Sequence, residues 1–254
     1  MKKQLQNINL IEKIAEYFFL ALLLAVGGGI VYFNLSDIRC SLDPDFACTI
    51  NYYIEAIRAG TLNLQNWYHT TSLELDGSMF LAVPLSFIVG DRFTAIGLAN
   101  IILIILYVVV IARLLHLYKV DKVFIYLTLL LVLTPYEYGM LDYYNMLFYG
   151  AAYYSIRTIV PILLLLILGL LREEVYKNKN GKIELIAFGI LYAVLLFLTA
   201  FSMGIFVVLC GLLPILVWMI LEMFIQGKPE FVLKKSVWAV WGATILSFGA
   251  GYLL

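Results

Sequence analysis

Long apolar stretches, separated by short polar segments, recur along the whole chain. Most are close to the ~20 residues that an α-helix needs to cross a ~30 Å hydrocarbon core. The pattern predicts an all-α, polytopic integral membrane protein with about seven transmembrane helices, all within one domain, 1–254. The predicted spans are about 14–33, 94–118, 123–135, 158–171, 185–201 and 205–225, and a last one that starts near 237 and is incomplete at 254.

One further apolar run, 79–89, is too short to cross a membrane and contains Pro84. We predict that it is a re-entrant or interfacial helix. It ends a large loop, 34–93, which follows the first span, and a second loop covers 135–157. A cleaved signal peptide is the alternative interpretation of the first span. The chain ends on an apolar stretch, so we expect it to be the N-terminal part of a longer protein.

The first loop opens with a dense polar segment, "SLDPDFACTINYYIEAIRAG", residues 41–60. Asp43 as the N-cap, Pro44 at the first helical position and Gly60 as the stop predict a helix here. One face of that helix is apolar enough to lie on a membrane surface. The residues on this face are Phe46, Ile50, Ile54 and Ile57.

Composition agrees with the pattern. Hydrophobic residues make up 63% of the 254 and charged residues 13%, about half the share of a soluble domain. The formal net charge is zero, so nothing points to nucleic acid as a partner.

The placement of the charges predicts the topology, because Lys and Arg accumulate in cytoplasmic loops. With the N-terminus in the cytoplasm, 13 of the 17 Lys and Arg residues fall on the inner side. Only Arg39, Arg58, Arg92 and Arg157 fall outside. Both loops are therefore predicted to be extracytoplasmic, in a protein of the cell membrane.

Two interpretations of Asp43 and Asp45 are possible from the sequence. Capping explains one aspartate, whereas carboxylates at this spacing also share a divalent cation or place a base beside one. Cys40 and Cys48 flank them, and either a disulfide or two free thiols fit the spacing.

The order of these features resembles the N-terminal module of the GT-C glycosyltransferases, membrane enzymes that use lipid-phosphate-linked sugars. "LDPDF" and the later "NW" are similar to the oligosaccharyltransferase catalytic subunits. "D…YY..A...G", 45–60, is closer to the bacterial and protein mannosyltransferases. The second loop departs from the family because it has no Asp-x-Asp, only Glu137 and Asp142.

The resemblance implies transfer of a sugar from a polyprenyl-phosphate-linked donor to an acceptor at the extracytoplasmic face. Asp43 or Asp45 would be the catalytic base. A divalent cation, Mg or Mn, would be held by Asp43, Asp45 and Glu137. The expected substrate-binding residues are Trp67, Tyr68, His69, Asp142 and Arg157.

These residues also have a simpler interpretation. The aromatic residues would belong to a belt at the membrane interface, and Arg157 would bind the phosphate of a lipid headgroup. The alternative functions are a polytopic transporter or flippase, and a non-enzymatic membrane assembly subunit. Partners expected in every case are membrane lipids, and nothing in the sequence indicates the oligomeric state.

Overall fold

The computed structural model describes residues 2–41, 44–61, 64, 75–134, 147–148, 152, 154–226 and 230–253, without the side chains of 2–9, 40–41, 44–46, 203 and 226. Every regular element in this part of the chain is helical. The elements are α1 (Lys2–Ser36), α2 (Ile38–Ser41), α3 (Pro44–Ala59), η1 (Leu75–Met79), α4 (Phe80–Val89), α5 (Arg92–Leu117), α6 (Lys122–Leu133), α8 (Ser155–Arg172), η2 (Val175–Lys177), α9 (Lys179–Val207), η3 (Val208–Leu212), α10 (Leu213–Gln226) and α11 (Lys235–Leu253).

Six helices within the described residues are long and apolar enough to cross a membrane, as expected for an integral membrane protein. They are Leu10–Ser36, Arg92–Leu117, Ser155–Arg172, Lys179–Ser202, Gly204–Ile225 and Lys235–Leu253. The third predicted span corresponds to α6, which has 12 residues and is shorter than a membrane crossing requires. A seventh span therefore stays a prediction.

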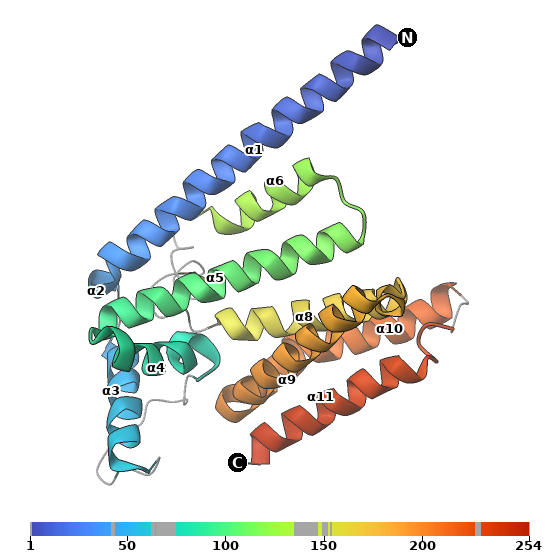
Figure 1. The fold of residues 1–254 in the computed structure, drawn as a ribbon. Helices are drawn as coiled ribbons and strands as arrows, with labels where there is room; N and C mark the ends of the chain where they lie inside the picture. The colour runs from blue at the N-terminus through green and yellow to red at the C-terminus, as the bar shows by residue number, and fades with distance from the viewer. Residues whose placement is uncertain are drawn as a thin grey trace.

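The long helices run back and forth between two ends of the bundle, and α5 and α8 run in the same direction because the short α6 returns the chain between them (Figure 1). Arg172 at the end of α8 bonds Glu222 near the end of α10, and Gly211, just before α10, lies close to Pro161 in the first half of α8, so these two helices run parallel. Tyr192 bonds Thr244, and Gly251 lies close to the carbonyl of Phe197, so α9 and α11 also run parallel.

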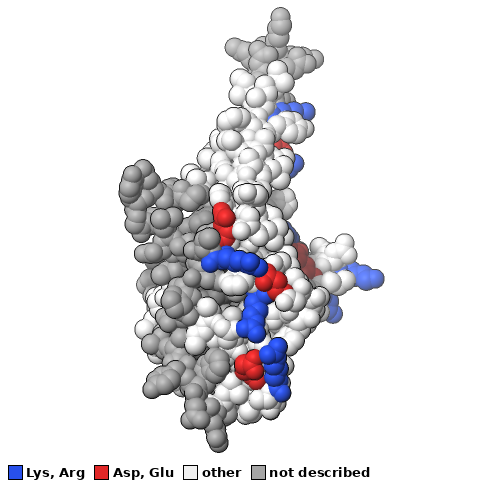
Figure 2. All heavy atoms as spheres, turned by 90° about the vertical axis from the view of Figure 1, so that its left-hand side faces the viewer, with Lys and Arg blue, Asp and Glu red and all other residues white. Residues whose placement is uncertain are grey.

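We call the end of the bundle that carries Arg113, Lys122, Arg172, Lys179 and Lys235 the basic end. The opposite end carries α2, α3, η1 and α4, together with the first turns of α5 and α8, and we call it the loop end. Figure 2 shows this end with the loop elements facing the viewer. The four arginines predicted to lie outside, Arg39, Arg58, Arg92 and Arg157, all belong to elements of the loop end.

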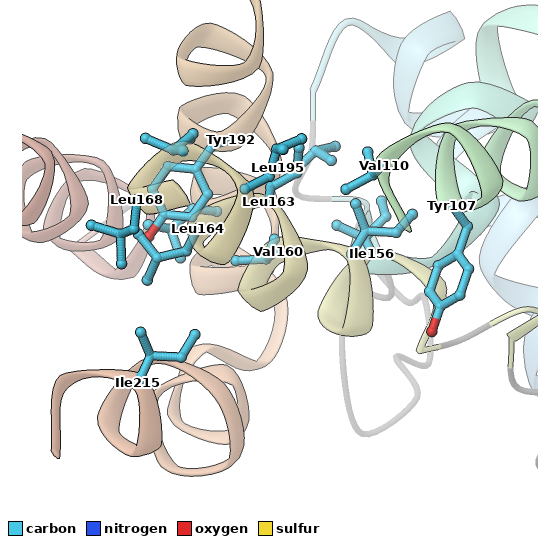
Figure 3. Packing of buried hydrophobic residues seen from close by; sticks show 14 of the residues in the cluster. Tyr107, Val110, Ile156, Val160, Leu163, Leu164, Leu168, Tyr192, Leu195 and Ile215 are labelled. Carbon is cyan, nitrogen blue, oxygen red and sulfur yellow. The ribbon is translucent and has the colours of Figure 1, made fainter. Parts of the chain in front are cut away.

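The core is built around α8. In the apolar span of α8, 72% of the residues are buried inside the molecule, compared with 11% in the span of α1. Val160, Leu163, Leu164 and Leu168 of α8 point into neighbouring helices, where they meet side chains of α5, α9 and α10 (Figure 3). Because α8 is enclosed on several sides, whatever its first turn carries is held in a fixed position.

A second apolar cluster lies at the loop end. Ile50 and Ile54 of α3 are each 3% exposed and belong to a cluster with Ala82 of α4 and Ile96 of α5. The predicted bounds of the α3 helix are confirmed, with Gly60 at φ +67° after its end. Its predicted membrane-facing surface is wrong for Ile50 and Ile54, because these side chains are buried in protein.

Candidate functional site

The η1 turn places an acidic side chain inside the loop end. It is a single π-helical turn that leads directly into α4, and Gly77 within it departs from helical dihedral angles (φ −104°, ψ −145°). Asp76, Gly77, Ser78 and Met79 are all buried. The backbone N–H of Leu75 donates to Ser202 Oγ of α9 at 3.0 Å. The turn is therefore attached to the bundle at its start and continues into α4 at its end.

Asp76 forms a bidentate ion pair with Arg157 in the first turn of α8. Arg157 Nη2 donates to Asp76 Oδ1 at 3.0 Å, and Arg157 Nε donates to Oδ2. The side chain of Asp76 is 0% exposed and that of Arg157 is 5% exposed. They are the only two charged residues in the described part of the chain that are fully buried.

One aromatic ring covers the guanidinium, and a second ring stacks on the first. The Cζ atom of Arg157 lies 4.6 Å from the ring centroid of Tyr154, which is a cation–π distance. Tyr154 in turn stacks on Phe206 of α9, with centroids 5.7 Å apart. Phe206 is 44% exposed. Tyr154 thus lies between Arg157 and a partly exposed ring.

Burial governs the electrostatics of the pair. Desolvation raises the pKa of Asp76, and the hydrogen bond and charge of Arg157 oppose that shift. Removing one partner of a buried pair is destabilising by about 3–5 kcal/mol, because the other charge is left without compensation. Asp76 and Arg157 therefore depend on each other.

Further charged residues lie at the surface of the loop end. Asp91 caps α5 by accepting from Thr94, and these hydrogen bonds lower the pKa of Asp91. Arg39 bonds Asp91 at 3.3 Å, and Arg58 bonds Glu55 at 2.7 Å. Figure 2 shows acidic and basic side chains alternating in a row across this face. Arg39–Asp91 joins α2 to the start of α5, whereas Arg58–Glu55 lies within α3.

A buried amide pair fixes α1 against α5 close to the same end. Asn100 Nδ2 donates to Asn34 Oδ1 at 2.9 Å, and both side chains are 0% exposed. Asn34 Nδ2 also donates to the carbonyl of Phe148 at 3.0 Å. The pair therefore joins α1, α5 and a described part of the second loop.

Most of the predicted site residues lie outside the described part of the chain. Asp43, Trp67, Tyr68, His69, Glu137 and Asp142 are in this group, and so is the side chain of Asp45. Arg157 is the one predicted site residue whose side chain the structure places. It meets Asp76, which the sequence analysis did not select; the only available signal was its position in "LDGSM", immediately before the short apolar run.

The metal site stays a prediction, and of the two alternatives for the cysteines the structure has a free thiol at Cys48. Among the described residues there is no group of three or more His, Cys, Asp or Glu side chains that would hold a metal ion, and the predicted ligands are outside that set. Cys48 carries a free thiol, while the side chain of Cys40 is not described.

Comparison of the chain with protein-family models, with curated proteins and with solved structures found no match. The site is therefore interpreted from its own chemistry.

Proposed function

We propose that the chain is the membrane module of a GT-C-type glycosyltransferase, which transfers a sugar from a polyprenyl-phosphate-linked donor at the loop end. The single observation that carries the proposal is the position of Arg157. A guanidinium is held on the most enclosed helix, at the end of an apolar bundle and beside an acidic loop. That is a suitable place for a cation that receives the phosphate of a membrane-embedded substrate.

The proposal includes an orientation. The basic end is cytoplasmic and the loop end extracytoplasmic, as the distribution of Lys and Arg favours. The seven-span topology requires α6 and the residues that follow it to complete the third crossing. The re-entrant role of α4 is supported by its 10 residues and by its packing against the start of α5 after a tight turn at Gly90.

The proposed reaction begins with an acceptor hydroxyl or amide bound beside Asp43 or Asp45. The carboxylate takes the proton as the nucleophile bonds to the anomeric carbon of the sugar. The bond from that carbon to the phosphate oxygen breaks, and the polyprenyl phosphate leaves with the electron pair. Arg157, or a divalent cation (Mg or Mn) held by Asp43, Asp45 and Glu137, would stabilise the charge that develops on this leaving group.

The sugar would be recognised by the remaining predicted residues. Trp67 and Tyr68 offer flat apolar surfaces that suit a sugar ring, and His69 and Asp142 offer hydrogen bonds to its hydroxyl groups.

Transport through the bundle is a weaker candidate for a physical reason. A transporter places charged groups along its path near the bilayer midplane. Within the described residues, the fully buried charges sit at the end of the bundle. Chemistry at the membrane surface fits this arrangement better.

The test is transfer activity of the full-length protein in membranes supplied with a panel of polyprenyl-phosphate sugars. Asp43→Asn and Asp45→Asn, made separately, are expected to include at least one variant with a ~100-fold or greater loss at normal expression. Asp37→Asn is the control, because Asp37 is an exposed acid of the same loop. If both variants transfer sugar at the parental rate, the catalytic assignment is wrong.

A further inference from the structure

We propose that Asp76 is a built-in competitor for the anion site of Arg157. In the free protein the η1 turn occupies this site, and the phosphate of an amphiphilic substrate displaces the carboxylate and releases η1. This inference rests on the proposed function, since it describes how the same site is regulated.

The first argument is chemical equivalence. A guanidinium binds a carboxylate and a phosphate with the same two-pronged geometry, through parallel N–H groups. Asp76 occupies Arg157 in this way through Nε and Nη2. A phosphate ester that reaches Arg157 therefore has to replace the carboxylate on the same donors.

The second argument is that Asp76 is carried by a small element. Among the described residues, its carboxylate bonds only Arg157 and its own backbone. The η1 turn that holds it is five residues long and is interrupted at Gly77. Displacing this turn breaks the bond between Leu75 and Ser202 but leaves the hydrogen bonds of α8 intact.

The third argument is the proximity of an exposed ring. Tyr154 lies against Arg157 and stacks on Phe206, which is 44% exposed. Two ion pairs of the basic end differ, because both partners of Arg113–Glu184 and of Arg172–Glu222 lie on long helices. Asp76, by contrast, is carried by the five-residue η1 turn.

The experiment measures binding of a polyprenyl monophosphate to the purified full-length protein in phosphatidylcholine nanodiscs. Asp76→Asn keeps the shape of the side chain and removes its charge, so it no longer competes with the phosphate for Arg157. Binding of the lipid is therefore expected to tighten about tenfold. Arg157→Gln is expected to abolish binding. Asp91→Asn, which removes an exposed carboxylate at the same end, is the control and leaves the affinity unchanged.

If Asp76→Asn binds the lipid with the same affinity as the wild type, or more weakly, the inference is wrong. If the wild type still binds through Arg157, the proposed function survives that result. If neither the wild type nor Asp76→Asn binds the lipid, both the inference and the proposed function are overturned.

A second measurement does not depend on the Asp76 variant. A Ser78→Cys reporter, with the three native cysteines replaced by serine, places a thiol in the buried η1 turn. Its labelling rate is expected to rise when the lipid phosphate is added. An unchanged rate, in protein that binds the lipid, rules out release of η1.

Discussion

A buried ion pair at the loop end differs from the partly exposed pairs of the basic end. At the basic end, Arg113–Glu184, Arg172–Glu222 and Lys234–Glu174 all retain contact with water, with side chains between 10% and 38% exposed. At the loop end, the Asp76–Arg157 pair is almost completely dehydrated. Partly exposed pairs tolerate the loss of a partner, whereas a dehydrated pair does not. The comparison marks the loop end as the place where charge is held under constraint.

The largest effect is expected from removing the arginine of each type of pair. Arg157→Gln should lower the free energy of unfolding by about 3–5 kcal/mol, because it leaves Asp76 buried without its partner. Arg113→Gln is the matched change at the basic end: its pair is also bidentate, but its side chains are 27% and 23% exposed. That variant should lose about 1 kcal/mol or less.

The measurement is unfolding of each protein in mixed micelles with an increasing fraction of denaturing detergent. Equal losses for the two variants would remove the distinction between the two ends. An Asp76→Leu/Arg157→Leu double variant should recover part of the loss seen for Arg157→Gln, because an apolar pair leaves no uncompensated charge.

A smaller effect is expected from the contact that joins α1 to α5 near the loop end. A Cβ atom at Gly97 would overlap the carbonyl oxygen of Asn34, whereas a Cβ atom at Gly189 of α9 would meet nothing within 4 Å. Gly97→Ala should therefore destabilise by about 1–3 kcal/mol. Gly189→Ala should be neutral or stabilising by up to about 1 kcal/mol, because it raises helix propensity.

The same unfolding assay compares these two variants. A neutral Gly97→Ala would mean that α1 and α5 do not approach closely at Asn34. It would also question the buried amide pair of Asn34 and Asn100.

Local signals explain why part of this architecture is predictable from the sequence. The bounds of α3 follow from Pro44 and Gly60, and those of α4 follow from an apolar run that Gly90 ends. The six long helices follow from length and apolarity alone. The third predicted span, by contrast, rested on 13 residues, and the helix found there has 12.

The candidate site is less predictable because it depends on contacts distant in sequence. Asp76 and Arg157 are 81 residues apart, and no local pattern pairs them. In the sequence Arg157 has the appearance of a lipid-phosphate anchor, and Asp76 that of one more loop acid. Likewise, an apolar face such as that of Ile50 and Ile54 suits a membrane surface and a protein neighbour equally well; only packing against α4 and α5 decides between them.

The smallest effect, and the most specific, is the change of stability with pH that two acids of the loop end cause. The two changes should have opposite signs. Burial raises the pKa of Asp76, so its contribution to stability is greatest below the unfolded pKa, about 3.9, and declines as the pH rises through the folded value. Bonds from Thr94 lower the pKa of Asp91, so its contribution is present above about 3.9 and is lost as the pH falls through the folded value. Between about pH 3 and about pH 8, the difference in melting temperature between wild type and Asp76→Asn should therefore shrink as pH rises, while that for Asp91→Asn should grow. If the two differences in melting temperature change in the same direction with pH, Asp76 is not dehydrated. The contrast between the buried pair and the exposed charges would then no longer hold.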